Sequence, residues 1–183
     1  MTPDPDHLFD QADRLAGRLT APPASEAEPR QTDLRRAISA AYYALFHFTL
    51  AAASDLFVGW DKRCTPEYQM TYRSVSHDWL RSLCEQLQRK RIAKIAPHAP
   101  GVAFFGPVVS FATIVAELQE LRHSADYDPS FSITADEAKF RIDEARKAVK
   151  LFQGATDAQR VAFLTLLMFN IRQTKAETVP PAP

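Results

Sequence analysis

LRRAISAAYYALFHFTLAAA, residues 34–53, is the stretch that decides the fold of this chain. It contains neither proline nor glycine, and nearly every position from Ala37 onward is apolar or aromatic. A helix that is apolar almost all round is buried on every side, because a surface helix would keep one polar face. The stretch therefore predicts a central helix that other helices surround.

Polar side chains nevertheless follow one line along this predicted helix. Ser39, Tyr43 and His47 recur at intervals of four residues, and residues at that spacing lie one above the other on the same side of a helix. Polar groups buried inside a protein are nearly always hydrogen-bonded. The sequence therefore predicts that another segment supplies partners for this line, and the line with its partners is a candidate functional site.

The composition is that of an ordinary globular protein. The 183 residues suit a single domain, and 46% of them are hydrophobic, which is enough for a proper core. The 22 basic residues equal the 22 acidic residues in number, so no overall charge attracts nucleic acid or a membrane. A local patch must therefore hold any anionic partner.

Other features of the sequence argue against several kinds of site and location. Cys64 and Cys84 are the two cysteines and lack a CxxC spacing, which argues against a zinc site and a disulfide framework. The acidic first residues lack the basic and apolar regions of a signal peptide. The longest apolar run, residues 37–53, is short for a membrane span. We expect a cytoplasmic protein with no metal, no cofactor and no membrane contact.

The pattern of the whole chain predicts an all-α protein. Prolines fall between periodic segments, and no strand alternation is found. Thr134 with Glu137, and Thr156 with Gln159, form capping boxes that open the last two helices. We expect an antiparallel bundle of about six helices that makes one domain over residues 1–173. The expected helices cover residues 6–19, 30–58, 69–90, 107–124, 134–153 and 156–172.

The last helix leaves two packing hypotheses open. Its apolar side chains lie on several faces, with Val161, Leu164, Met168 and Ile171 on one and Phe163, Leu166, Leu167 and Phe169 on others. One face can close the bundle, so the remainder needs a second cover. Either a second copy covers it, in a homodimer, or the helix lies in a groove between two helices of its own bundle. Residues 174–183, ending in VPPAP, are expected to form a disordered tail.

A second group of polar residues lies near the end of the fourth expected helix. Arg122 continues the apolar stripe of Val115 and Leu118, and a guanidinium facing the core must meet a carboxylate, carbonyl groups or a bound anion. Asp126 can reach it if the helix continues for one more turn. The two residues then form a buried structural pair with Tyr127 capping the core, or Arg122 contacts a phosphate. Physical chemistry alone favours the structural pair.

The sequence RAISAAYYALFH at residues 36–47, followed later by Arg122-x-x-Ala125-Asp126-Tyr127, resembles the HEPN family. The likeness is closest to a prokaryotic branch whose helices carry SRAYYAxFH and RxxADY, and it covers residues 33–152. The resemblance implies an all-α bundle, often dimeric, linked in many members to RNA binding or RNA cleavage. It also implies a role in toxin–antitoxin or phage-defence systems, sometimes beside a nucleotidyltransferase partner.

Active HEPN proteins use an arginine followed four to six residues later by a histidine, and they cleave RNA without metal. This chain carries a degenerate form of that motif, because Asp126 and Tyr127 stand where the histidine would fall. The resemblance and the polar line together predict two sets of site residues. The candidate catalytic residues are Arg122, His47 and Asp126, and the candidate RNA- or phosphate-binding residues are Arg122, Tyr127, Tyr43 and Ser39. The alternative for His47 is a neutral histidine hydrogen-bonded inside the bundle.

One basic run remains, Arg89, Lys90, Arg91 and Lys94. Cations at a helix C-terminus complement the helix dipole, which explains the run; as an RNA patch it would supply a few phosphate contacts. Two functions therefore stay open. The first is an RNA-associated protein of the toxin–antitoxin or defence type, and the second is a non-catalytic module for dimerisation or partner binding.

Overall fold

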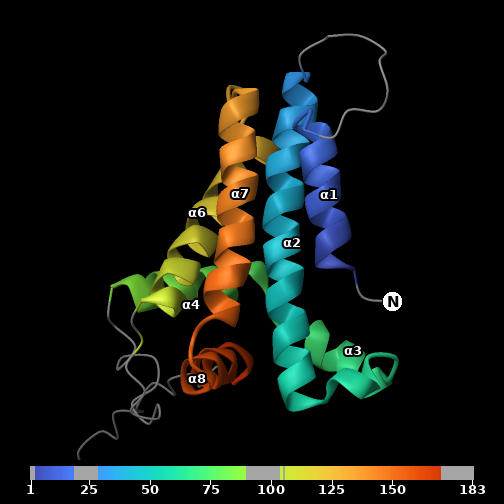
Figure 1. The fold of residues 1–183 in the computed structure, drawn as a ribbon, viewed down its shortest axis with the longest axis vertical. Coiled ribbons are helices and arrows are strands. Elements are labelled where there is room, and N and C mark those ends of the chain that lie inside the picture. The colour runs from blue at the N-terminus through green and yellow to red at the C-terminus, as the bar shows by residue number, and fades with distance from the viewer. Residues whose placement is uncertain (1–2, 19–28, 90–103, 105, 170–183) are drawn as a thin grey trace, which may run out of the picture.

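A computed structural model of the protein describes residues 3–18, 29–89, 104 and 106–169. The described residues form an all-α bundle, which confirms the predicted fold class (Figure 1). Seven α-helices and one 3-10 turn lie in these ranges: α1 Pro5–Leu15, α2 Gln31–Phe57, η1 Trp60–Lys62, α3 Pro66–Tyr72, α4 His77–Gln88, α6 Pro107–Tyr127, α7 Ala135–Gln153 and α8 Asp157–Met168.

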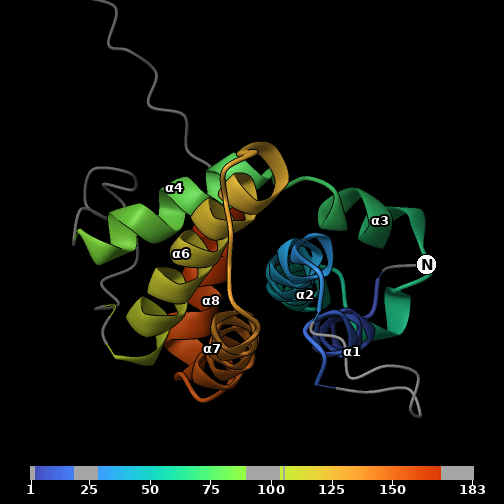
Figure 2. The same cartoon turned by 90° about the horizontal axis from the view of Figure 1, so that it is seen from above.

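Four helices, α1, α2, α6 and α7, run alternately up and down the bundle (Figure 1). Helix α2 lies at the centre and contacts the other three. Helices α3, α4 and α8 lie towards the end of the bundle at which α2 finishes, and α4 crosses α6 (Figure 2). The polar side chains of α2 therefore face α6 at one end and the short helices at the other.

Helix α2 is the core helix because its side chains are buried on more than one face. Ala41, Tyr42, Ala44 and Leu45 point in four directions around the helix, and all four are fully buried. Among the described helices, α2 alone is long and apolar enough to cross a membrane, but 72% of that apolar window is buried inside the bundle. Its apolar character is therefore that of a core helix.

The helix expected over residues 69–90 is wrong in one respect, because it is two helices, α3 and α4, separated by residues 73–76. The break is stabilised locally: the Ser74 hydroxyl donates to the carbonyl of Thr71 at 2.7 Å. The Ser76 side chain accepts from the backbone N–H of Trp79 and caps the start of α4. Apolar periodicity continues across the break, so the periodicity alone could not show it.

Two other boundaries also differ from the expected ones. Helix α1 ends at Leu15 rather than residue 19, because Gly17 adopts a positive φ of 74° that ends the helix. Helix α6 continues to Tyr127, one turn beyond Ser124. Both predicted N-caps of the last two helices are present, since Thr134 and Thr156 each accept a backbone N–H three residues on. The expected tail over residues 174–183 lies outside the described residues.

Helix α8 packs within its own chain. Phe163 and Leu167 are fully buried, and the Phe163 ring meets Phe111 and Phe152 edge-on at centroid distances of 5.5 and 5.6 Å. The intrachain groove therefore accounts for most of the apolar side chains that appeared to need a second cover. Phe169 is 58% exposed, and the homodimer stays a prediction.

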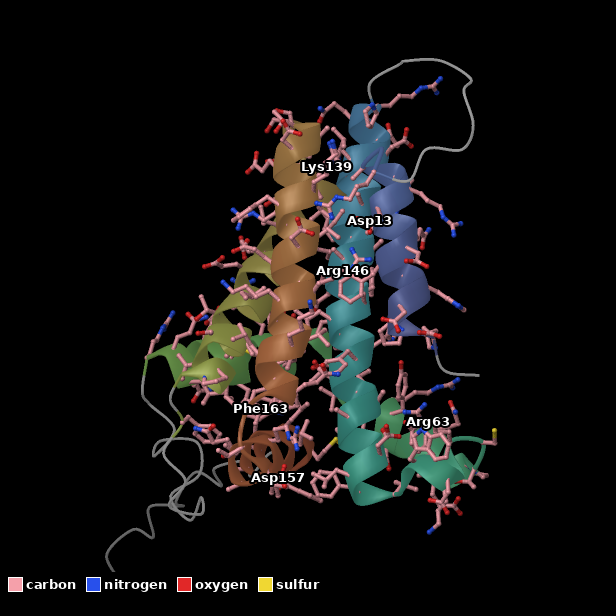
Figure 3. All side chains as sticks on the ribbon, in the orientation of Figure 1. Asp13, Arg63, Lys139, Arg146, Asp157 and Phe163 are labelled. Atoms are coloured by element: carbon pink, nitrogen blue, oxygen red, sulfur yellow. The ribbon has the colours of Figure 1, made fainter. Side chains whose placement is uncertain are left out.

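An ion-pair cluster joins α1 to α7 across the front of α2 (Figure 3). Asp13, which is buried, accepts from Arg146 of α7 at 2.7 Å and from Arg18 at 3.1 Å. Arg18 also binds both carboxylate oxygens of Asp143 at 2.7 Å. Two-oxygen contacts of this kind are stronger and more directional than a single ion pair. The cluster therefore fixes α1 against α7, with α2 held beneath them.

If α8 belongs to the core of a single chain, Phe163→Ala should lower the free energy of unfolding by about 3–5 kcal/mol, because it leaves a large cavity. Phe169→Ala removes the same ring from an exposed position and should change the free energy of unfolding by less than about 1 kcal/mol. Urea denaturation of both variants provides the measurement. Equal losses would contradict the intrachain packing of α8.

Candidate functional site

The polar line on α2 is longer than the sequence analysis recognised. It begins at Gln31 and Arg35 and continues through Ser39, Tyr43 and His47, at intervals of four residues. Four residues turn an α-helix by about 400°, so the line moves around the helix by about 40° at each step. Its first members therefore meet α6 and the segment after it, whereas its last member meets α3.

Arg35 holds the end of α6 against α2. Its guanidinium donates to the carbonyls of Ala125 at 2.7 Å, Asp128 at 2.8 Å and Phe131 at 3.3 Å. The last carbonyl groups of a helix have no partner within the helix, and a cation there also complements the helix dipole. The sequence analysis missed this role, although Arg35 stands four residues before Ser39 and so extends the polar line.

Four of the predicted site residues meet at the middle of the line. Ser39 donates its hydroxyl to Asp126 Oδ1 at 2.6 Å. Asp126 Oδ2 lies 2.8 Å from Nε of Arg122, and the Nη2 of Arg122 donates to the Tyr43 hydroxyl at 2.7 Å. The side chains of Arg122 and Asp126 are only 19% and 18% exposed. The extra turn of α6 therefore produces the ion pair that the four-residue spacing predicted.

The guanidinium of Arg122 is charged and almost fully surrounded. Burial lowers its pKa, but Tyr43 and Asp126 raise the pKa by more, so the net shift is upward. The guanidinium carbon lies 5.3 Å from the centre of the Tyr43 ring and 5.7 Å from that of Tyr127. Its Nε–H makes no directed hydrogen bond despite the short distance to Asp126, so that contact is an ion pair. Asp126 balances the charge.

The predicted catalytic residue His47 faces α3. Its Nδ1 lies 2.7 Å from the Tyr72 hydroxyl, and no hydrogen bond or ion pair joins it to Arg122 or Asp126 within the described part of the chain. Its placement matches the hydrogen-bonded histidine that the sequence analysis held as the alternative. The reason is the drift of the polar line, which carries His47 about 40° beyond Tyr43.

A second histidine, His77 at the start of α4, enters the same region. Its Nδ1 lies 2.8 Å from the Tyr42 hydroxyl, and its ring stacks on Phe46 at a centroid distance of 3.8 Å. Burial lowers the pKa of His77, Arg122 lowers it further, and Asp78 partly opposes them. Burial also lowers the pKa of His47, with His77 adding to the effect. Both histidines are therefore neutral at pH 7.

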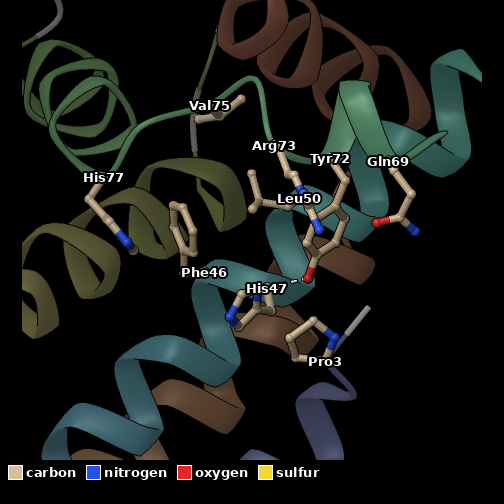
Figure 4. A pocket seen from close by; sticks show the side chains of 9 residues that line it. All are labelled: Pro3, Phe46, His47, Leu50, Gln69, Tyr72, Arg73, Val75 and His77. Carbon is tan, nitrogen blue, oxygen red and sulfur yellow. Dashed lines mark hydrogen bonds between the residues drawn. The ribbon is translucent and has the colours of Figure 1, made fainter. Parts of the chain in front are cut away.

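Two hollows flank the central ion pair. One, of about 540 Å³, lies where the start of α2 meets the end of α6, and Arg36, Asp126 and Tyr127 are among its lining residues. The other, of about 330 Å³, lies between α2, α3 and the start of α4, and His47 and His77 line it (Figure 4). The site is therefore a strip along α2 with an opening at each end.

The remaining candidates add little to the site. No group of three or more histidine, cysteine, aspartate or glutamate residues that could hold a metal ion occurs in the described residues. Cys64 is exposed and Cys84 is buried, and both are free thiols. Of the basic run, Arg89 is described and is exposed at the end of α4; its other members lie outside the described residues.

No protein-family model, curated protein or solved structure matches this chain. The resemblance to HEPN proteins therefore stays a prediction, which rests on residues 36–47 and on the Arg122–Tyr127 motif.

Asp126→Ala should lower the free energy of unfolding by about 1–3 kcal/mol, because it removes the partners of Ser39 and Arg122 and leaves both polar groups poorly satisfied. The matched control is Asp136→Ala, which removes a carboxylate that is 97% exposed and 3.6 Å from Lys139. Because Asp136 lies in the first turn of α7, the control should lower the free energy of unfolding only by the helix-dipole contribution, less than about 1 kcal/mol. A loss in the control equal to that of Asp126→Ala would contradict the structural role of the pair.

The two half-buried histidines should make the protein less stable in acid. Their folded-state pKa values lie below the ordinary value of 6.5, so the unfolded chain binds more protons as the pH falls. The contribution of the neutral histidines to the free energy of unfolding is fully present above pH 6.5 and is lost as the pH falls through the two folded-state pKa values. The stability advantage of the unchanged protein over His47→Gln should shrink in that window. Denaturant unfolding at a series of pH values provides the measurement.

Proposed function

We propose that the protein binds single-stranded RNA at the hollow between the start of α2 and the end of α6. The observation that carries this proposal is an exposed aromatic ring held in place beside a cation. Tyr127 is 65% exposed, and it lies against Arg122 on one side and against His123, with ring centroids 5.0 Å apart. A ring that is already fixed offers a stacking surface to a base at little entropic cost.

Arg36 supplies the phosphate contact in this proposal. It is exposed, it lines the hollow, and it makes no ion pair within the described part of the chain. Arg35 is occupied by three carbonyl groups, and the charge of Arg122 is balanced by Asp126. In this proposal Arg36 therefore binds the RNA backbone phosphate, while Arg122 orients the Tyr127 ring. This assignment replaces Arg122 with Arg36 as the main phosphate-binding residue.

The HEPN resemblance supports RNA as the ligand. The degenerate motif favours binding over cleavage, because Asp126 and Tyr127 occupy the positions of the expected histidine. His47, a predicted catalytic residue, is hydrogen-bonded to Tyr72 and lines the other hollow. The proposal is therefore an RNA-binding protein of the HEPN type, with a net charge of zero and a small local site.

Fluorescence anisotropy with a labelled RNA strand of about 12 nucleotides tests this proposal. Tyr127→Ala should weaken binding by about 5- to 150-fold, which corresponds to the loss of about 1–3 kcal/mol of stacking. Arg36→Gln should weaken binding and should reduce the slope of log affinity against log salt concentration by about 0.7, since one phosphate contact is lost.

Two variants serve as matched controls for these changes. Phe140→Ala removes another exposed ring that lies against an arginine, Arg141, at 5.5 Å but lines no RNA hollow. Arg14→Gln removes an exposed cation from α1. Neither should alter RNA affinity. Absence of RNA binding by the unchanged protein, or equal effects of Tyr127→Ala and Phe140→Ala, would rule the proposal out.

A further inference from the structure

The smaller hollow carries an arrangement of donors that the proposed RNA site does not use. Its volume is about 330 Å³, within the range of small-molecule sites. It is lined by apolar residues of α2 and of the α3–α4 connection, among them Leu50 and Val75, and by the polar side chains of His47, His77, Arg73 and Gln69 (Figure 4). Small-molecule sites usually have this composition, with a few polar groups on a mainly apolar surface.

A tyrosine orients each histidine in this hollow. Tyr72 holds Nδ1 of His47 at 2.7 Å, and Tyr42 holds Nδ1 of His77 at 2.8 Å. The second ring nitrogen, Nε2, makes no hydrogen bond in either histidine within the described part of the chain. Hydrogen-bonding one nitrogen of an imidazole fixes the ring and determines what the other nitrogen presents. Each histidine–tyrosine pair therefore holds Nε2 of its imidazole ring in a fixed orientation.

These histidine–tyrosine pairs suit both protonation states. Burial raises the pKa of Tyr72 to about 12 and also raises that of Tyr42, so both hydroxyls keep their protons. In one neutral tautomer the histidine accepts the tyrosine proton at Nδ1 and carries its own proton on Nε2, whereas in the other tautomer Nδ1 donates and Nε2 accepts. A charged histidine donates from Nδ1 to the tyrosine oxygen and also carries a proton on Nε2. Nε2 can therefore donate to an oxyanion in the first tautomer and in the charged form.

Arg73 adds a permanent cation to these donors. It follows the last residue of α3 and extends alongside Leu50 and Tyr72 (Figure 4). It is exposed and makes no ion pair within the described residues. The fork of a guanidinium matches two oxygens of a tetrahedral oxyanion. Two imidazole rings and a guanidinium that makes no ion pair among the described residues therefore line the same hollow.

Arg73 is the cation at this hollow that makes no ion pair among the described residues, since Asp126 balances Arg122. The titratable and charged groups that face the two histidines are Tyr42 and Tyr43 on α2, Tyr72 and Arg73 at α3, Asp78 on α4 and Arg122 on α6. Pro3, ahead of α1, lines the hollow without a charge. Asp78 is the one carboxylate in this set, and it lies in the first turn of α4.

We propose that this hollow binds a tetrahedral oxyanion of the phosphate type, held by Nε2 of His47, Nε2 of His77 and the guanidinium of Arg73, and that binding draws protons onto the histidines. The site is separate from the proposed RNA site. His47 lies eleven residues beyond Arg36 on α2, a distance of about 16 Å along the helix. A phosphate group can come from a free anion or from the end of a nucleic acid strand, and both have the same chemistry.

The pKa values of the two histidines are low in the absence of an anion, and a bound anion should raise them. Burial lowers both histidine pKa values when no anion is present; His77 adds to the effect on His47, and Arg122 adds to the effect on His77. A bound dianion stabilises the imidazolium forms instead. The affinity should therefore rise as the pH falls, by at most about tenfold per pH unit for each histidine that becomes charged on binding.

Sulfate is the best first probe, because it stays a dianion across this pH range and any pH dependence then belongs to the protein. We would titrate the full chain with sulfate at about pH 5.5 and about pH 7.5 and follow the histidine ring resonances by NMR. The signals of His47 and His77 should shift together and saturate, with tighter binding at the lower pH. The exposed His7 and His123 provide internal controls and should not shift with the same saturation.

Arg73→Gln should weaken sulfate binding about tenfold, in line with the loss of one charge-assisted contact. Because Arg73 is exposed, this variant keeps its fold and the test stays decisive even if histidine variants are unstable. Arg14→Gln is the matched control and should bind sulfate like the unchanged protein. No saturable shift, equal shifts at His7 and His123, or an affinity independent of pH would overturn the proposal.

Competition experiments separate the two sources of phosphate. Inorganic phosphate, RNA with a 5′-phosphate and the same RNA with a 5′-hydroxyl would each be added to the sulfate complex. Displacement by inorganic phosphate but not by either RNA identifies a free anion as the ligand. Displacement by the 5′-phosphate strand but not by the 5′-hydroxyl strand identifies a strand end. Displacement by none of them would overturn the phosphate assignment. Sulfate binding does not depend on RNA, so loss of the RNA proposal would leave this one standing.

Discussion

The structure depends on one constraint: the central helix α2 is buried and yet carries polar side chains that all need partners. The partners come from α6 and from α3. Arg35 donates to the last carbonyls of α6, Ser39 and Tyr43 bind Asp126 and Arg122 of the same helix, and His47 is hydrogen-bonded to Tyr72 of α3. The polar line therefore positions α6 and α3 on α2, and the candidate site is a product of the same contacts.

Much of this arrangement could be predicted from the sequence. An all-round apolar helix, two capping boxes and the absence of strand patterns were enough for the fold class. The spacing of Arg122 and Asp126 also predicted their ion pair, which the extra turn of α6 then made possible. These predictions held because each rests on a local property of the chain, namely periodicity, capping or a four-residue interval.

The parts that sequence could not predict depend on contacts between distant segments. The four-residue line drifts around α2, so its last member turns from α6 to α3, and His47 meets Tyr72 rather than Arg122. His77 joins the site only because residues 73–76 separate α3 from α4, a break hidden by continuous apolar periodicity. The same contacts decide which cations are free to bind a ligand: Arg35 is occupied and Arg122 is balanced, whereas Arg36 and Arg73 are not.

The central position of α2 also has a consequence during synthesis, because α2 emerges before the helices that contain several of its partners. Its partner Asp126 lies 87 residues after Ser39, which is about 4–17 s of synthesis at about 5–20 residues per second. The interval is longer for the buried Asp13, because its partner Arg146 follows 133 residues later. During that interval an apolar helix of 27 residues has emerged without α6 and α7, which cover it in the folded bundle. The nascent chain is therefore most exposed to aggregation and to chaperone capture before α6 and α7 emerge, and its central helix is the segment at risk.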